Sequence, residues 1–290
     1  MPLRYAYYPG CASQEVTKEA NDSTRKVAEA LGIELVDMPK ANCCGAGLMT
    51  DYDRELWLSL NARIFAQAEE MGMDIMTICS TCLMVMNSAN HALTTDPAQL
   101  KKTNALLAKA GIKYEGNIKI TQLLWVLAED FGLNNLRAKV TRPLSRLKVA
   151  PFYGCHSLRP SEVLGVDDPE KPHTLDDVIR ALGADTVSYS GKTKCCGFQV
   201  DLVAEETAVE MTGKRLLDAK ERGSDCMVTP CPFCHINLDS YQGLAEKQAS
   251  QKIDVPIFHL SQLVGVAIGL TEGDLGLSRN MVSPERLIRT

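Results

Sequence analysis

Short apolar runs alternate with longer amphipathic stretches in the first half of the chain. Apolar positions recurring at helical spacing predict helices over Gln14 to Leu31 and Asp53 to Met71, and a glycine follows each stretch as a helix C-cap would. The β-rich runs before and between these helices predict strands at Leu3 to Tyr8, Ile33 to Met38 and Asp74 to Ile78. This βαβαβ order is typical of a parallel sheet.

The second half repeats the same alternation. Its helices are predicted near Thr174 to Leu182 and Ala204 to Arg222. Its strands are predicted near Lys148 to Tyr153, Thr186 to Ser190 and Met227 to Thr229. We therefore expect an α/β fold with two tandem related domains, 1–140 and 147–290, each with βαβ units around a small parallel sheet. The polar, proline-containing stretch Arg137 to Arg146 is the expected linker.

Two short segments of the first half have echoes in the second, as an internal duplication would leave. Ala30-Leu31-Gly32-Ile33 is echoed by Ala181-Leu182-Gly183-Ala184. Ile120-Thr121-Gln122-Leu123-Leu124 is echoed by Leu260-Ser261-Gln262-Leu263-Val264. The second copy also carries the acidic, proline-rich stretch Asp167 to Pro172, which we expect to be a surface insertion.

Ten of the eleven cysteines follow one pattern that occurs twice. The pattern is a lone cysteine, then an adjacent pair followed by glycine, then a C-x-x-C, and the same gap of 34 residues separates the pair from the C-x-x-C in both copies. Each part follows a predicted parallel strand, and the carboxyl ends of parallel strands share one edge, so each set should converge on one edge of its sheet. The two sets are Cys11, Cys43, Cys44, Cys79 and Cys82, and Cys155, Cys195, Cys196, Cys231 and Cys234.

Composition narrows what these thiol clusters can do. A chain of 290 residues that is 45% apolar can bury a large core without disulfides. The first residues lack a secretory signal pattern, so we expect a reducing, cytoplasmic location, where clustered cysteines usually bind metal or do redox chemistry. Tetrahedral zinc and ordinary iron–sulfur clusters take four ligands, and each set here has five. A metal or iron–sulfur site is favoured, with zinc or a redox disulfide as the alternatives.

Charge and hydropathy argue against other kinds of ligand. The net charge is -5 and no basic block runs along the chain, which argues against nucleic acid. The apolar stretch Leu263 to Leu270 is too short to span a membrane, so any membrane association is expected to come through partners, without direct insertion. The sequence has no phosphate-binding glycine loop and no flavin or nicotinamide fingerprint. Electrons are therefore expected to arrive from, or leave to, a partner protein.

The duplicated cysteine pattern resembles that of the CCG-domain proteins, in particular the B subunit of heterodisulfide reductase. The likeness covers nearly the whole chain and includes Tyr153-Gly154-Cys155-His156, Cys231-Pro232-Phe233-Cys234-His235 and His259-Leu260-Ser261-Gln262-Leu263. It implies that each set of five cysteines binds one noncubane [4Fe-4S] cluster. One departure is that Phe198-Gln199-Val200 follows the second Cys-Cys-Gly, where family members often have a glycine-rich run.

The resemblance also implies an activity and partners. It suggests a catalytic subunit that makes and breaks disulfide or sulfane-sulfur bonds reversibly at two clusters, acting on a small thiol, a disulfide or carrier-bound sulfur. Its partners would be a ferredoxin-like subunit with cubane [4Fe-4S] clusters and a flavin-containing subunit. One alternative is an electron-relay CCG subunit of a quinone-linked dehydrogenase of the lactate, glycolate or succinate type. Another is a zinc-stabilised interaction scaffold.

A few residues outside the cysteine sets have chemistry to offer. His156 follows Cys155 directly and is the candidate catalytic residue, as a proton donor to a departing thiolate or a hydrogen-bond donor to cluster sulfur, with a structural histidine as the alternative. His235 is expected at a helix start, and Cys226 is expected to pack as a small apolar residue. Structural or surface roles are expected for His91, His173 and His259.

Overall fold

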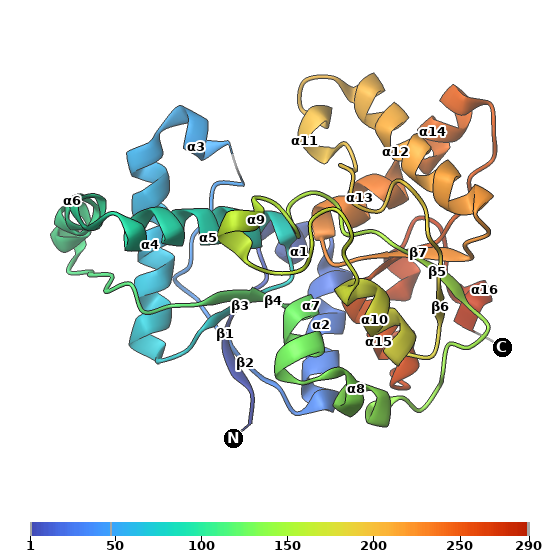
Figure 1. Ribbon diagram of the computed structural model, residues 1–290, viewed down its shortest axis with the longest axis horizontal. Helices are drawn as coiled ribbons and strands as arrows, with labels where there is room; N and C mark the ends of the chain where they lie inside the picture. Colours follow the sequence, from blue (N-terminus) through green and yellow to red (C-terminus); the bar gives the residue numbers. More distant parts are fainter. Residues whose placement is uncertain (1, 47, 289–290) are drawn as a thin grey trace.

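Two four-stranded parallel sheets form the centre of the molecule (Figure 1). The structure is a computed structural model that describes residues 2–46 and 48–288. The first sheet has the order β2-β1-β3-β4 and the second the order β6-β5-β7-β8, with every neighbouring pair parallel. The strands are β1 (Arg4–Tyr8), β2 (Glu34–Asp37), β3 (Ile75–Thr77), β4 (Ile120–Gln122), β5 (Lys148–Pro151), β6 (Asp185–Thr186), β7 (Cys226–Thr229) and β8 (Ile257–His259).

Helices connect the strands in both halves and cover the sheets. The first half contains α1 (Cys11–Glu15), α2 (Lys18–Leu31), α3 (Met49–Tyr52), α4 (Arg54–Met71), α5 (Ser80–Thr95), α6 (Pro97–Leu107), the 3-10 turn η1 (Ala108–Ala110), α7 (Leu123–Trp125), the π-helical turn η2 (Val126–Asp130) and α8 (Leu133–Lys139). The second half contains α9 (Ser161–Leu164), α10 (Thr174–Ala181), α11 (Phe198–Asp201), α12 (Glu205–Glu221), α13 (Pro232–Ser240), α14 (Gln242–Ala249), α15 (Leu260–Ala267), η3 (Leu277–Arg279) and α16 (Glu285–Ile288). No helix in this described part of the chain is both long and apolar enough to cross a membrane.

The expected α/β class with two related parallel-sheet units is confirmed, with three local differences. Each sheet has a fourth strand, β4 or β8, that the apolar runs did not predict. The helix expected from Gln14 to Leu31 is split into α1 and α2, because the chain turns at Thr17, whose φ and ψ are -110° and 58°. The strand expected from Thr186 to Ser190 is shorter, because β6 has only two residues. Beyond it, the Val187 amide still donates a hydrogen bond to the Val149 carbonyl of β5.

The fourth strands show that the second pair of similar segments, 120–124 and 260–264, is not structurally equivalent. In the first sheet Gln122 lies opposite Thr77, and in the second His259 lies opposite Thr229. Gln122 and His259 therefore occupy equivalent places at the ends of β4 and β8. The similarity between the two segments pairs Gln122 with Gln262, which lies three residues beyond its structural equivalent. Local likeness around the Gln-Leu pairs caused the error, because backbone pairing across the sheet fixes the equivalence and no single segment carries that information.

The two repeats pack against each other in a nearly twofold manner. α2 of the first repeat lies along α15 of the second, and Figure 1 shows these two helices side by side where the halves meet. In the reciprocal contact, α10 of the second repeat packs against α7, η2 and α8 of the first. Buried apolar residues from both repeats form one cluster. The hydrophobic core therefore continues across the junction, which holds the carboxyl edges of the two sheets in a fixed relation.

Candidate functional site

Each C-x-x-C begins at the N-terminus of a helix that follows the third strand of its repeat. Cys79 is the N-cap residue of α5, with φ and ψ of -120° and 118°. Cys231 is the N-cap residue of α13, with nearly the same values of -129° and 121°. The partial positive charge of a helix N-terminus favours thiolate over thiol, so this placement suits cysteines that act as metal ligands.

In the first repeat, short sulfur contacts connect the five cysteines predicted as one site. The sulfur atoms of Cys44 and Cys82 lie 3.6 Å apart, within hydrogen-bonding distance. Cys43 sulfur accepts hydrogen bonds from the Cys11 and Cys44 thiols, which lower the pKa of Cys43 to about 2. The Gly45 amide adds a third bond to Cys43 at 3.4 Å. Cys79 and Cys82 are hydrogen-bonded to each other. The five side chains thus lie together, as the strand pattern predicted.

The second repeat has the same arrangement. Cys195 sulfur accepts from the Cys155 and Cys196 thiols, which lower the pKa of Cys195 to about 2, and the Gly197 amide donates to it at 3.3 Å. Cys234 is hydrogen-bonded to Cys196 and Cys231, and these bonds together with burial raise the pKa of Cys234. Two separate sets of loops therefore produce the same pattern of donors and acceptors around five sulfur atoms.

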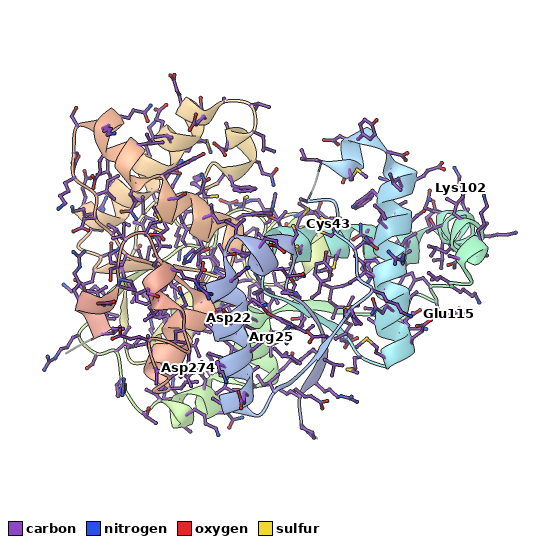
Figure 2. All side chains as sticks on the ribbon, turned by 180° about the vertical axis from the view of Figure 1, so that it is seen from behind. Asp22, Arg25, Cys43, Lys102, Glu115 and Asp274 are labelled. Carbon is purple, nitrogen blue, oxygen red and sulfur yellow. The ribbon has the colours of Figure 1, made fainter. Side chains whose placement is uncertain are left out.

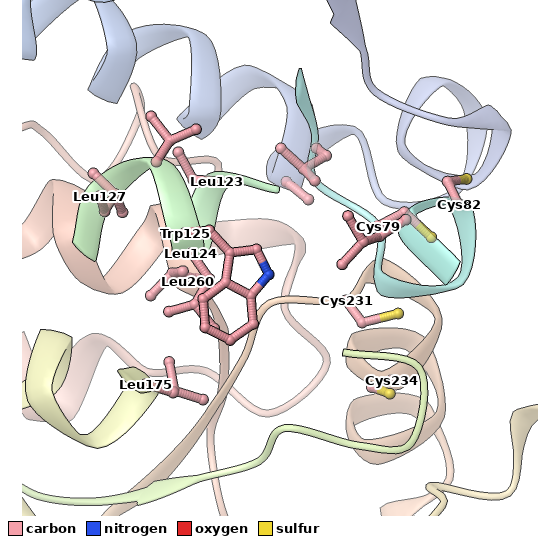
Figure 3. Packing of buried hydrophobic residues seen from close by; sticks show 14 of the residues in the cluster. Cys79, Cys82, Leu123, Leu124, Trp125, Leu127, Leu175, Cys231, Cys234 and Leu260 are labelled. Carbon is pink, nitrogen blue, oxygen red and sulfur yellow. The ribbon is translucent and has the colours of Figure 1, made fainter. Parts of the chain in front are cut away.

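The two sites touch through their C-x-x-C motifs. Cys79 of the first repeat and Cys231 of the second lie within hydrogen-bonding reach of each other. The backbone amide of Thr81, inside the first C-x-x-C, also donates to Cys231 sulfur. Figure 3 shows Cys79, Cys82, Cys231 and Cys234 gathered at one side of the buried cluster that contains Trp125. The ten cysteines accordingly form one connected series across the junction of the repeats.

Glycine before the lone cysteine leaves space for the opposite ligand in both repeats. A Cβ atom on Gly10 would lie 3.1 Å from Cys82 Sγ, and one on Gly154 would lie 3.1 Å from Cys234 Sγ. Both glycines have positive φ, 81° and 70°, which other residues adopt at a cost. The backbone therefore approaches the C-x-x-C sulfur closely in each site, as a compact sulfur-ligated centre requires.

The two sites differ in how open they are. Cys11 and Cys43 are exposed and line a cleft of about 700 Å³ together with Tyr8 and Arg25. Figure 2 shows Cys43 and Arg25 on this side of the molecule. Gln14, Asn21 and Asp37 complete much of the polar wall of this cleft.

The second site is closed by a pair of aromatic rings. Phe198 and Phe233 stack with their centroids 4.0 Å apart and an interplanar angle of 18°. They line a space of only about 20 Å³ beside Cys155 and Cys195, which are half-buried. At the equivalent positions of the first repeat the sequence has Ala46 and Thr81, whose side chains are small. The residues that break the glycine-rich pattern after the second Cys-Cys-Gly therefore contribute to a lid over that site.

His156 lies beside both sites. Its Nδ1 is 3.1 Å from Thr81 Oγ1, so it bridges the second repeat to the first C-x-x-C, and it lines the small space of the second site. Burial lowers the pKa of His156, which keeps the ring mostly neutral at neutral pH. The sequence predicted its proximity to Cys155, whereas Thr81 as a partner could not be foreseen because it comes from the other repeat.

The remaining histidines and Cys226 lie where the sequence predicted, and some of them are more deeply buried than expected. His235 is in the first turn of α13, fully buried, with Nε2 3.7 Å from Glu19 Oε1 of α2. His259 is buried at the end of β8, whereas His91 and His173 are exposed. Cys226 is buried in β7, where it packs as a small apolar residue as predicted.

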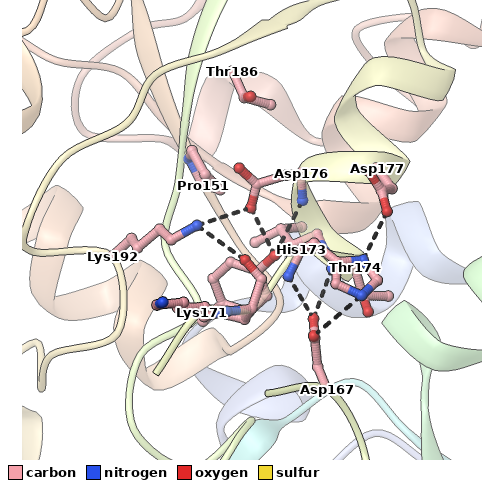
Figure 4. Close-up of polar contacts among 12 residues, drawn as sticks. Pro151, Asp167, Lys171, His173, Thr174, Asp176, Asp177, Thr186 and Lys192 are labelled. Carbon is pink, nitrogen blue, oxygen red and sulfur yellow. Dashed lines mark hydrogen bonds and ion pairs between the residues drawn. The ribbon is translucent and has the colours of Figure 1, made fainter. Parts of the chain in front are cut away.

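A buried tyrosine supports the second site, and the sequence analysis, which quoted Tyr153 only as part of the family resemblance, assigned it no role. Tyr153 Oη donates to Asp176 Oδ2 at 2.7 Å and accepts the amide of Leu175 at 2.9 Å. Figure 4 shows Lys192 reaching the same carboxylate, and its Nζ lies 3.4 Å from Asp176 Oδ2. In the predicted insertion, Asp167 accepts backbone amides at the start of α10 and so anchors that loop. These bonds fix the strand end that leads into Gly154 and Cys155.

The donor set fits a centre with several metal atoms better than one bare ion. Each site offers five sulfur atoms, glycine backbone that leaves room beside them and amides directed at sulfur. Thiolate sulfur with amide hydrogen bonds is the environment in which proteins hold iron–sulfur clusters.

Comparison with known proteins places the chain in a family. The family model described as a cysteine-rich domain, CCG, matches residues 5–87 and 149–239. The chain belongs to this CCG cysteine-rich family, and each match contains one of the two five-cysteine sites. The expected relation to the B subunit of heterodisulfide reductase is confirmed. That subunit of the ferredoxin/F(420)H(2)-dependent CoB-CoM heterodisulfide reductase of Methanosarcina acetivorans is 32% identical over 96% of this chain and 94% of that protein.

Two further relatives and one solved structure are informative. The chain is 40% identical to the 8-methylmenaquinol:fumarate reductase membrane anchor subunit of Wolinella succinogenes, over 99% of this chain and 100% of that protein. It is 34% identical to a heterodisulfide reductase B-subunit-like protein of Archaeoglobus profundus, over 92% and 91% of the two chains. A hypothetical protein from Helicobacter pylori has the same fold, with a TM-score of 0.81 at 16% identity, and matches 98% of this chain but 52% of its own.

Proposed function

We propose that this chain is an iron–sulfur subunit that relays electrons inside a multisubunit reductase. The observation that carries the proposal is the contact between Cys79 and Cys231, which joins two five-cysteine sites into one series. Clusters bound at the two sites would supply one-electron transfer. The protein contributes ten thiolates, the Gly45 and Gly197 amides that stabilise negative charge on sulfur, and a buried core that keeps the two sites at a fixed separation.

The clusters we propose are two [4Fe-4S] clusters of noncubane type. A cubane cluster is satisfied by four cysteines, and each site presents five that are mutually connected. The first would be held by Cys11, Cys43, Cys44, Cys79 and Cys82, and the second by Cys155, Cys195, Cys196, Cys231 and Cys234.

Within this class, a quinol-linked reductase of the fumarate reductase type is the complex we favour. The full-length 40% identity to the Wolinella succinogenes protein supports this choice over the 32 to 34% identity to heterodisulfide reductase subunits. The lid formed by Phe198 and Phe233 supports it too, because the two stacked rings cover the second site beside Cys155 and Cys195 and so restrict the access of a disulfide from solvent. An enclosed site suits electron relay, which needs no substrate access.

The second candidate is a catalytic subunit of heterodisulfide reductase type, with a ferredoxin-like subunit and a flavin-containing subunit for partners. The cleft of about 700 Å³ beside Cys11 and Cys43 favours it, since a small thiol or disulfide could reach the first site there. His156 would then be the candidate proton donor, because it lies between the second site and Thr81 of the first C-x-x-C.

Metal analysis of the chain purified without oxygen tests the cluster assignment. We expect about eight irons and about eight acid-labile sulfides per chain, because two four-iron clusters contain that many. Cys195→Ser should lower both values by about half while the first cluster stays assembled. Stoichiometric zinc without iron would overturn the cluster assignment and favour a zinc-stabilised scaffold.

A redox experiment separates the two candidate complexes. The reduced chain is mixed with a small aliphatic disulfide, and released thiol is measured alongside the cluster spectrum. A relay protein should be reducible and reoxidisable with a chemical mediator while releasing no thiol. Catalytic thiol release would favour the heterodisulfide reductase type, and a Phe198→Ala variant that gains this reaction would identify the lid as its barrier.

A further inference from the structure

The last residue of each fourth strand reaches across to the opposite repeat. His259, at the end of β8, has Nε2 3.3 Å from the carbonyl oxygen of Ile78. Gln122, at the end of β4, donates from Nε2 to the carbonyl oxygen of Pro230 at 2.7 Å. Ile78 and Pro230 are equivalent residues, because each immediately precedes the first cysteine of a C-x-x-C. The two hydrogen bonds are therefore reciprocal.

The hydrogen-bond pattern fixes the tautomer of His259. Its Nδ1 faces the Ser261 hydroxyl at 2.7 Å and the Ser261 amide at 3.4 Å, and an amide can only donate, so Nδ1 is the acceptor. The proton is then on Nε2, which donates to the Ile78 carbonyl. Burial lowers the pKa of His259 to about 4, so the ring is neutral at neutral pH and this arrangement persists.

Gln122 begins a directed chain of hydrogen bonds between the repeats. Its Nε2 also donates to Ser80 Oγ at 3.0 Å. Ser157 Oγ donates to the Tyr153 carbonyl at 2.7 Å, so the 2.6 Å contact between the two serine hydroxyls is donated by Ser80. Ser80 lies inside the first C-x-x-C and Ser157 two residues after Cys155. Polar side chains thus tie the ligand loops of one site to those of the other.

We propose that Gln122 and His259 are positioning residues that clamp the two C-x-x-C motifs together, so that the two clusters behave as one coupled redox unit. Each bond holds the carbonyl immediately before Cys79 or Cys231, the two cysteines through which the sites touch. The proposal rests on the proposed function insofar as both sites bind clusters. The clamp itself is a property of the polypeptide.

Burial makes this pair of bonds effective. Gln122 and His259 are both inaccessible to solvent, so water cannot replace a lost bond to either carbonyl. A buried carbonyl without a donor is unfavourable, and the molecule can relieve this by separating the two sheet edges slightly. Such a movement would lengthen the Cys79–Cys231 contact while leaving each five-cysteine site intact.

Because Gln122 and His259 are equivalent residues, matched variants can be made at the two positions. His259→Leu and Gln122→Leu remove the donors at similar size, and the double variant removes both. His259→Gln installs at the end of β8 the side chain that the first repeat uses at the end of β4, so it should restore the bond. Circular dichroism and iron content establish that each variant is folded and loaded before the sites are compared.

The first readout is the magnetic interaction between the two reduced clusters, followed by electron paramagnetic resonance in the anaerobic protein. We expect broadened or split signals in the wild type, weaker splitting in the Leu variants, and a loss of splitting in the double variant. His259→Gln should keep the wild-type spectrum. Unchanged splitting in the double variant at full iron content would overturn the proposal.

The second readout needs no cluster and so separates failure of the clamp from failure of the proposed function. In a full-length Cys82→Ser, Cys234→Ser background, metal is removed and diamide oxidises Cys79 and Cys231, two thiols giving one disulfide and two electrons and two protons to the diamide. Trypsin then cuts between the repeats, and mass spectrometry measures the linked peptides. We expect strong cross-linking that falls several-fold with Gln122→Leu plus His259→Leu. A folded background without cross-linking, or equal yields, would overturn the clamp even if the wild type binds two clusters.

Discussion

At the scale of single residues, Gly154 determines how closely the backbone approaches the second site. It has φ of 70°, and a Cβ there would lie 3.1 Å from Cys234 Sγ. Gly165 provides a matched control, because its φ is 60° and nothing lies within 4 Å of the place a Cβ would occupy. The two positions share the backbone strain and differ in contact with a ligand sulfur.

Gly154→Ala is therefore expected to lose iron from the second site, whereas Gly165→Ala is not. Both variants should lose about 1–2 kcal/mol of unfolding free energy, because alanine resists a left-handed backbone. Iron per chain and denaturant unfolding measure the two effects separately. Equal iron content in the two alanine variants would mean that the close approach to Cys234 has no bearing on the cluster.

The buried side chain of His259 also makes the stability of the folded protein depend on pH. Its pKa is about 4 in the folded protein and near 6.5 when unfolded, so the unfolded state binds the proton more readily between these values. The stability from a neutral His259 is complete above pH 6.5 and is lost as the pH falls from 6.5 towards 4. His235, whose pKa burial lowers to about 3, acts in the same direction.

We expect the unfolding free energy of the wild type to fall more steeply than that of His259→Gln over pH 6.5 to 4. The difference in slope should approach about 1.4 kcal/mol for each pH unit at most, the equivalent of one proton. Denaturant unfolding of metal-free protein at a series of pH values measures both slopes, and His235 remains in both proteins as a common background. Parallel slopes would show that His259 does not titrate on unfolding.

At the scale of elements, the lid over the second site is formed by residues from two helices that are far apart in the sequence. Phe198 starts α11 and Phe233 lies in the first turn of α13, yet their rings stack at 4.0 Å. The sequence predicted each site's five cysteines, because strand ends and motif spacing are local properties. It could not predict the lid or the Gln122 and His259 contacts, because these depend on how one loop or sheet edge lies against another.

The lid leads us to expect unequal reactivity of equivalent cysteines in metal-free protein. Iodoacetamide should alkylate the exposed Cys43 before its half-buried equivalent Cys195, and the exposed Cys11 before its half-buried equivalent Cys155, as mass spectrometry of quenched samples would measure. Phe198→Ala should speed labelling of Cys195 several-fold and leave Cys43 unchanged. Tyr52→Ala, at an exposed aromatic on α3, is the control that should change neither. Equal labelling of the two repeats in the wild type would contradict an enclosed second site.

At the scale of the whole molecule, the repeats depend on each other for burial. α2 lies along α15, and the buried Ser23 hydroxyl of the first repeat is 2.6 Å from the Ser261 hydroxyl of the second. Glu19 and His235 form a buried contact across the same junction. The sequence predicted the duplication but not this shared core. The apolar positions of α2 and α15 predict that one face of each helix is buried, but they do not show whether that face covers its own sheet or the other repeat.

Separating the repeats should therefore expose apolar and polar groups that neither half can satisfy alone. We expect residues 1–140 and 147–290, expressed individually, to be poorly soluble or partly unfolded, and to form a one-to-one complex when expressed together. Size-exclusion chromatography and circular dichroism would measure both outcomes. In the co-expressed pair, Ser23→Asp should weaken association, because it places a charge in the buried Ser23–Ser261 contact. Glu29→Ser, at an exposed position of α2 whose carboxylate pairs with Lys26 of the same helix, should not. Two halves that are each stable and monomeric, with no affinity for each other, would show that the domains are independent and that only the chain connection keeps the two sites in contact.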